Sequence, residues 1–135
     1  MIELRSDNAA GVAPEILAAI GEANAGSALA YGSDETTARL QDVVREVFEH
    51  PTARAFPVTS GTAANSLCLS AMVRPWGSVV CHESAHIITD EAGATSMLSG
   101  GALMVPVGGD NARIGPEPLR TRLAAARWGD HHNSQ

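Results

Sequence analysis

This chain of 135 residues contains no lysine, and all nine of its basic residues are arginines. Without lysine it cannot itself supply the ε-amino group that amine nucleophiles and Schiff bases require. Fifteen acidic residues leave a formal net charge of −6, and the arginines form no basic block. Nucleic acids and anionic membrane surfaces are therefore poor candidates for partners.

Cysteines and long apolar runs are also scarce. Cys68 and Cys81 stand thirteen residues apart without a C-x-x-C pair, which predicts buried free thiols in a reducing compartment rather than a disulfide framework. No run approaches the ~18 apolar residues that a membrane helix needs, and residues 1–5 lack a charged-then-apolar leader. We therefore expect a cytoplasmic protein that makes no membrane contact.

The sequence lacks the two common nucleotide-binding motifs. Neither G-x-G-x-x-G nor G-x-x-x-x-G-K-[ST] occurs, so neither a dinucleotide nor a nucleoside triphosphate site is indicated. What does occur is Ser60-Gly61-Thr62, between a short apolar stretch and a helical one. Its hydroxyls, backbone N–H groups and helix dipole suit a phosphate group. The run predicts a phosphorylated ligand, and an ordinary helix cap is the alternative.

Apolar periodicity predicts helices that alternate with short strands. Helices are expected from Pro14, between Asp34 and Phe48, and over residues 62–73, 90–98 and 116–126; strands are expected over residues 53–58, 78–81 and 102–107. This alternation is typical of a parallel α/β sheet. The polar tail, residues 127–135, stands where another strand is due. It predicts truncation of a longer chain, with a frayed terminus as the alternative.

A zinc-peptidase signature, His82-Glu83-x-x-His86, also occurs. That chemistry requires both histidines on one face of a helix. Here the motif follows a strand-like stretch, so we predict no metal site. For His86 two interpretations remain: a half-buried polar residue at a strand end, or an imidazole stacked on a flat cofactor ring beside the phosphate site.

Several short motifs occur together in an order that is far more specific than any one of them. They are Leu4-Arg5-Ser6-Asp7, Tyr31-Gly32-x-Asp34-x-Thr36, Ser60-Gly61-Thr62-x-x-Asn65, and Ala85-His86 before Glu91-Ala92-Gly93. In this order and spacing, residues from about 2 to about 107 resemble the N-terminal part of the threonine aldolases of the aspartate-aminotransferase fold.

The resemblance implies a fold and an activity. The fold would be a three-layer αβα arrangement, with part of the mostly parallel sheet of the pyridoxal-phosphate-dependent transferase large domain, incomplete in this chain. Residues 1–135 would form the N-terminal part of that domain, with helices in residues 1–50 and alternating strands and helices in 51–126. The full-length enzyme would use pyridoxal 5′-phosphate to cleave L-threonine and L-allo-threonine into glycine and an aldehyde.

The resemblance also implies roles for individual residues. Residues 60–62 would hold the cofactor phosphate, and His86 would stack on the pyridine ring and assist proton transfer from the substrate hydroxyl. Ser6 would meet the substrate carboxylate. Tyr31 would lie near the active site of a neighbouring subunit in a homo-oligomer, a dimer or a tetramer.

The family's Schiff-base lysine lies beyond the region of resemblance, so the isolated chain is expected to be inactive. Residues 8–12 also differ from the turn with threonine and proline that the family usually has, which leaves the choice of substrate open. Another pyridoxal-phosphate lyase or transferase of the same fold is the main alternative. A zinc peptidase and a non-enzymatic interaction module are the others.

Overall fold

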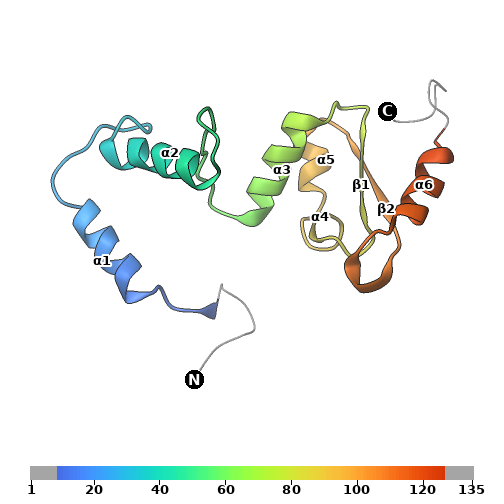
Figure 1. Cartoon of the computed structure of the whole chain (residues 1–135), viewed down its shortest axis with the longest axis horizontal. Coiled ribbons are helices and arrows are strands. Elements are labelled where there is room, and N and C mark those ends of the chain that lie inside the picture. The colour runs from blue at the N-terminus through green and yellow to red at the C-terminus, as the bar shows by residue number, and fades with distance from the viewer. Residues whose placement is uncertain (1–8, 127–135) are drawn as a thin grey trace. The chain divides into compact units, whose positions relative to one another are not determined.

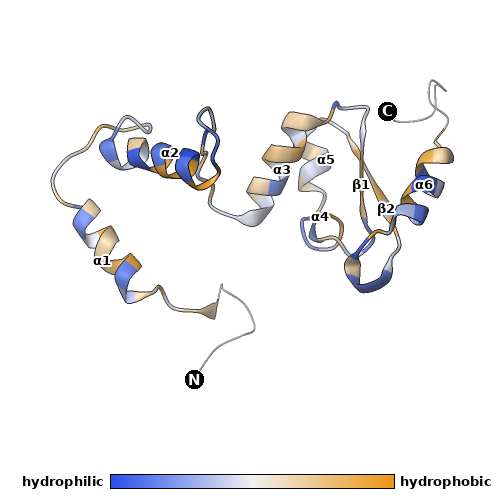
Figure 2. Cartoon of the chain, in the orientation of Figure 1, coloured by the Kyte–Doolittle hydropathy of each residue, from blue (hydrophilic) through white to orange (hydrophobic). Residues whose placement is uncertain are grey.

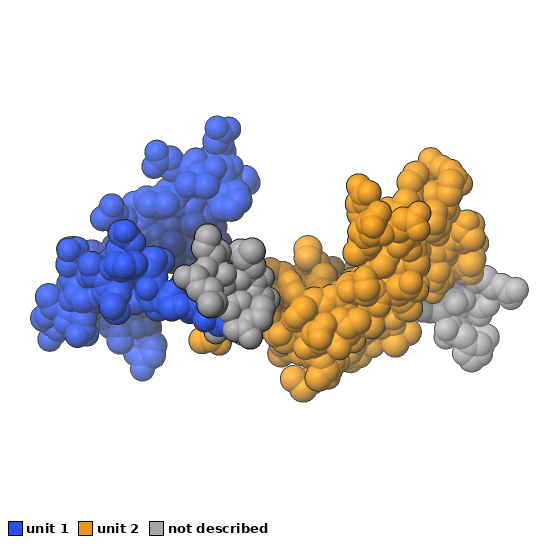
Figure 3. Space-filling view, turned by 90° about the horizontal axis from the view of Figure 1, so that it is seen from below, with its two compact units in different colours: residues 1–56 blue, residues 57–135 orange. Residues whose placement is uncertain are grey.

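The computed structural model describes residues 9–126. The chain divides into two compact units, residues 1–56 and residues 57–135 (Figure 3). The amino-acid composition shows no shift at this boundary.

The first unit contains two helices, α1 (Pro14–Ala23) and α2 (Glu35–Val47). Pro14 opens α1 at the position where its missing N–H costs nothing. Asp34 caps α2, because its side chain accepts a hydrogen bond from the backbone N–H of Thr37 at 2.8 Å. The structure confirms the predicted helix between Asp34 and Phe48 to within one residue at each end.

The strand predicted over residues 53–58 is wrong, because this segment forms no ladder with any described residue. A strand is defined by a hydrogen-bonded neighbour, and the apolar pattern does not say whether one is present. Here a side chain takes the neighbour's place. The amide of Gln41 donates from Nε2 to the Ala55 carbonyl and accepts from the Ala55 N–H through Oε1, both at 2.9 Å.

The second unit is built on two parallel strands, β1 (Ser78–His82) and β2 (Leu103–Val107). Their register runs from Ser78 opposite Leu103 to His82 opposite Val107. The helical elements are α3 (Gly61–Met72), α4 (His86–Thr89), α5 (Ala94–Leu98), the 3₁₀ helix η2 (Asp110–Ala112) and α6 (Pro116–Ala124). In Figure 1 the helices α3 and α5 lie on one side of the strands, and α6 lies on the other. This arrangement confirms the expected parallel α/β class.

The single helix predicted over residues 90–98 is also wrong. The structure has α4, which begins at His86, and α5, which begins at Ala94. Between them, Ala92 and Gly93 have φ angles of 49° and 77°. A right-handed helix cannot pass through two consecutive left-handed residues, so the chain turns sharply here.

The buried apolar residues of the described chain, Ala102, Val105 and Val107, lie in or next to β2. Figure 2 shows β2 among the more hydrophobic segments and α6 as largely hydrophilic. Helices α3 and α5 pack on each other, and two small polar residues, Ser66 and Thr95, are fully buried. Small side chains let helix backbones approach closely, so this contact brings the start of α3 near the α4–α5 turn.

The expectation of buried cysteines is half wrong. Both thiols are free, but Cys68 is exposed on α3, and only Cys81 on β1 is partly buried. Burial raises the pKa of the Cys81 thiol above its usual value. No helix within residues 9–126 combines the length and the hydrophobicity needed to cross a membrane.

Candidate functional site

The start of α3 has an open helix N-terminus. Ser60 is extended and caps the helix, with Oγ accepting a hydrogen bond from the Ala63 N–H at 3.1 Å. The Ser60 carbonyl accepts the first helical hydrogen bond, from Ala64. The N–H groups of Gly61 and Thr62 therefore precede the hydrogen-bonded turns and are available to a ligand.

The space beside Gly61 is open among residues 9–126. Apart from its chain neighbours and the backbone of α3, no atom of these residues lies within 4 Å of a Cβ atom placed on Gly61. An uncovered helix N-terminus with free N–H groups and a positive dipole end is suited to an anion such as phosphate. The serine cap and a bound phosphate are compatible, because they use different N–H groups.

His86 is the first residue of α4, and its side chain is 64% exposed. Its Nδ1 lies 2.8 Å from Oε1 of Glu91, whose side chain has no exposed surface. The same Oε1 accepts a hydrogen bond from Nδ2 of Asn65 at 2.6 Å. Asn65 lies one helical turn beyond Gly61, so this Asn65–Glu91–His86 chain ties His86 to the start of α3. The structure thus brings two of the predicted site segments together.

The environment of Glu91 favours its ionised form. The hydrogen bond from Asn65 is the largest cause that lowers its pKa below the usual value of 4.5, and the hydrogen bond and charge of His86 add to it. Burial acts in the opposite direction. The second carboxylate oxygen, Oε2, is buried without a partner in the described part of the chain.

Asn65 and Glu91 both occur in the motifs that the sequence analysis describes, but the sequence predicted no role for either residue. Their contact spans 26 residues, and no local pattern indicates such a contact. The only local signal was an acidic residue placed directly before a glycine-containing turn.

His82 does not act with His86 as the zinc-peptidase motif requires. It ends β1, whereas His86 begins α4. Both ring nitrogens of His82 have partners: Nδ1 lies 2.8 Å from the Ser84 hydroxyl, and Nε2 lies 2.9 Å from the Gly109 carbonyl oxygen. Within residues 9–126 no three potential metal ligands cluster. The geometry gives the metallopeptidase interpretation no support.

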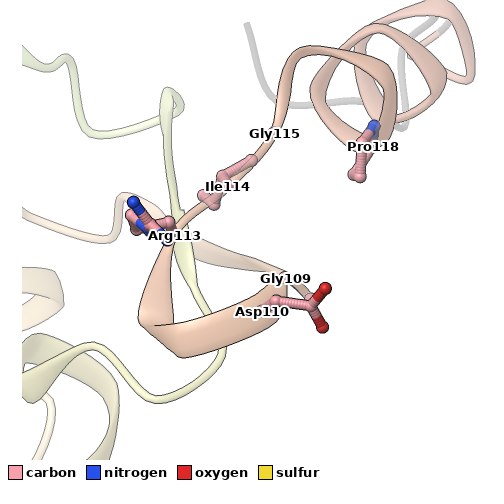
Figure 4. Close-up of a pocket in the computed structure, with 7 residues that line it drawn as sticks. Gly109, Asp110, Arg113, Ile114, Gly115 and Pro118 are labelled. Carbon is pink, nitrogen blue, oxygen red and sulfur yellow. The ribbon is translucent and has the colours of Figure 1, made fainter.

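An open cavity of about 480 Å³ lies at the turn after β2, between Gly108 and Pro118. Figure 4 shows its two charged side chains, Asp110 and Arg113, pointing away from each other. The cavity contains none of the predicted site residues. Its polar groups do not converge, so it lacks the arrangement expected of a specific ligand site.

Comparison with known proteins identifies the family. Residues 3–135 match the family model of the beta-eliminating lyases. This chain belongs to the beta-eliminating lyase family. It is 41% identical over 130 residues to a low specificity L-threonine aldolase of Pseudomonas aeruginosa, covering 96% of this chain and 37% of that protein.

Two further comparisons match one more curated relative and one solved structure. Over 85 residues, 62% of this chain and 21% of its relative, the chain is 41% identical to an alanine racemase of Cochliobolus carbonum. The solved structure of Leishmania major threonine aldolase superimposes with a TM-score of 0.80 at 26% identity, over 88% of this chain and 34% of that one. The chain thus has the fold of the matched part of that enzyme, and it spans between about a fifth and somewhat more than a third of the length of these two curated relatives.

The two other predicted site residues, Ser6 and Tyr31, belong to the first unit. Ser6 is outside the described residues. Tyr31 belongs to the first unit, where its side chain is fully exposed and its backbone is left-handed, with φ of 60°. The roles given to Ser6 and Tyr31 stay predictions.

Proposed function

We propose that the full-length protein is a pyridoxal 5′-phosphate-dependent aldolase. It cleaves L-threonine and L-allo-threonine, which are β-hydroxy-α-amino acids, into glycine and an aldehyde. The supporting observation is the Asn65–Glu91–His86 chain, which links an exposed imidazole to α3 one turn beyond its open N-terminus. Residues 1–135 form the N-terminal part of the cofactor-binding domain.

The donor groups on this chain fit the cofactor's phosphate. The N–H groups of Gly61 and Thr62 lie in the first turn of a helix where a Cβ atom on Gly61 would find open space, and Ser60 and Thr62 add hydroxyl groups to the same segment. When bound, the cofactor's protonated ring supplies a sink for the electron pair of the broken Cα–Cβ bond. His86 would stack on that ring and would receive the proton of the substrate hydroxyl. Ser6 would bind the substrate carboxylate.

The isolated chain is inactive on this proposal, because it contains no lysine. We further propose that the protein is a homo-oligomer, a dimer or a tetramer, in which Tyr31 lies near a neighbouring subunit's active site. The fully exposed ring of Tyr31 supports this proposal. The two free cysteines support a reducing, cytoplasmic location.

A product assay tests the reaction. The full-length protein, supplied with pyridoxal 5′-phosphate, is given L-threonine, L-allo-threonine, phenylserine, L-cysteine and L-alanine separately. We expect glycine and acetaldehyde from both threonines. The alternative, another enzyme of the same fold, is favoured by the alanine racemase relative. Racemised alanine or degraded cysteine without threonine cleavage would establish that alternative.

Two histidine variants sharpen the assay. His86→Asn removes the ring that we place on the cofactor, and we expect it to lower kcat by about 100-fold, within the range of general acid–base contributions. His50→Asn is the matched control, because His50 is exposed in the other unit, where its Nδ1 lies 3.3 Å from the Thr52 hydroxyl. Equal activities of the two variants would contradict the role of His86.

A further inference from the structure

Glu91 has a carboxylate that is fully buried, although the imidazole it touches is mostly exposed. One oxygen, Oε1, receives hydrogen bonds from Asn65 on α3 and from His86 on α4. A simple structural ion pair would not need one partner to remain open to solvent. The arrangement instead fixes one edge of the His86 ring and leaves the rest accessible.

We propose that Glu91 is a positioning residue that holds the His86 imidazole with its proton on Nδ1 and leaves the lone pair on Nε2. An ionised carboxylate can only accept hydrogen bonds, so Nδ1 must be the donor. The hydrogen bond at one ring nitrogen selects the tautomer and thereby the character of the other nitrogen. Asn65 keeps the carboxylate in place by donating to the same oxygen.

This inference rests on the proposed function, for which it supplies the accepting atom. In aldol cleavage the substrate hydroxyl must lose its proton. A neutral imidazole with Nδ1 protonated can accept that proton at Nε2, so that the substrate O–H bond breaks and an N–H bond forms. With the opposite tautomer, Nε2 would already carry a proton and could not act as the base.

His82 provides an internal reference for the measurement. Its Nε2 faces the Gly109 carbonyl oxygen and must donate, while its Nδ1 accepts from the backbone N–H of Ser84 at 3.1 Å. Two histidines of the same unit therefore carry their protons on different nitrogens. A method that assigns His82 correctly can be relied on to assign His86.

The experiment determines the tautomer of each ring in the full-length protein. The protein is labelled with ¹⁵N-histidine, kept free of cofactor and substrate, and studied by two-bond proton–nitrogen correlation at a pH where the rings are neutral. His86→Gln and His82→Gln assign the signals. We expect Nδ1–H at His86, a mixture of tautomers in Glu91→Gln, and the native pattern in the control Asp90→Asn, which alters the exposed neighbouring carboxylate.

Kinetics give a second readout on the same variants. With the ring less well held, Glu91→Gln should lower kcat about tenfold or more while KM changes little, because substrate binding does not involve Glu91. If Glu91→Gln does not fold, Asn65→Ala decides, since Asn65 is exposed and its loss frees the carboxylate from α3. It too should give mixed tautomers.

An Nε2–H tautomer at His86 in the native protein overturns the inference, as does an unchanged tautomer in the variant that folds. The proposed function fails separately. A protein with the expected tautomers that does not cleave threonine refutes the aldolase activity alone. A protein that cleaves threonine with a tautomer independent of Glu91 refutes the positioning role alone.

Discussion

The turn between α4 and α5 gives two opposite predictions at adjacent residues. Ala92 and Gly93 are both left-handed, with φ of 49° and 77°. An L-residue with a side chain is strained in this conformation by about 1–2 kcal/mol, and glycine is not. Gly93→Ala should therefore destabilise the protein, and Ala92→Gly should stabilise it.

The magnitude follows from the local geometry. A Cβ atom on Gly93 would meet no atom within 4 Å, so Gly93→Ala adds conformational strain without a steric clash. Alanine also reduces the conformational freedom of the unfolded chain, which raises the free energy of unfolding by about 0.4–1 kcal/mol. The net loss for Gly93→Ala is about 1 kcal/mol, roughly a fivefold change in the unfolding equilibrium. Ala92→Gly should gain a similar amount.

The assay is urea unfolding of the full-length protein followed by circular dichroism. Gly21→Ala is the control, because Gly21 lies inside α1 with open space around it and should gain about 0.5–1 kcal/mol from the better helix former. Because the turn places Glu91, Gly93→Ala should also disturb the Nδ1 signal of His86. A stabilising Gly93→Ala, or a destabilising Ala92→Gly, would refute the strain assigned to this turn.

Two further predictions concern other turns and caps. Gly109→Ala should lower the free energy of unfolding by about 1–3 kcal/mol, because its Cβ would overlap the carbonyl oxygen of Arg113. Gly108→Ala is the control and should be tolerated, since a Cβ atom there has only the Glu83 carboxylate nearby, at 3.7 Å. Equal unfolding midpoints of the two variants would contradict this prediction. Hydrogen bonds from the backbone and then the hydroxyl of Thr37 lower the pKa of Asp34 below its usual 3.8. Since the folded value is the lower one, this carboxylate stabilises α2 fully above pH 3.8 and loses its contribution as the pH falls through the lowered value. Hydrogen exchange of the α2 amides should accelerate there, and Asp34→Asn, which keeps a capping oxygen, should abolish that pH dependence.

Local signals predicted a helix well where its N-cap residue and the spacing of its apolar residues indicated the same segment. At α2, the Asp34 cap and the spacing of apolar residues from Leu40 to Phe48 indicated both ends. The sequence did not predict the turn after α4. Alanine normally favours a right-handed helix, so no local pattern indicates a left-handed backbone at Ala92. Residues 53–58 were assigned to a strand on their pattern alone, but a strand depends on a neighbour elsewhere in the chain.

The candidate site was predicted in part for a similar reason. The Ser60–Thr62 run and His86 carry recognisable chemistry, so pattern and resemblance could single them out. The roles of Asn65 and Glu91 depend on a contact between α3 and the α4–α5 turn. Because such a contact arises only when helices pack, no spacing in the sequence could show that one buried oxygen joins both side chains.

The central claim is that the start of α3 receives the cofactor's phosphate, and Gly61→Val tests it most directly. A Cβ atom on Gly61 meets no other part of residues 9–126 within 4 Å, apart from its chain neighbours and the backbone of α3, so the new side chain starts in open space. The measurement is the affinity of the full-length protein for pyridoxal 5′-phosphate by equilibrium dialysis. The account predicts a loss of about tenfold or more, which corresponds to about 1.4 kcal/mol, with urea unfolding nearly unchanged. Native affinity in Gly61→Val would contradict it.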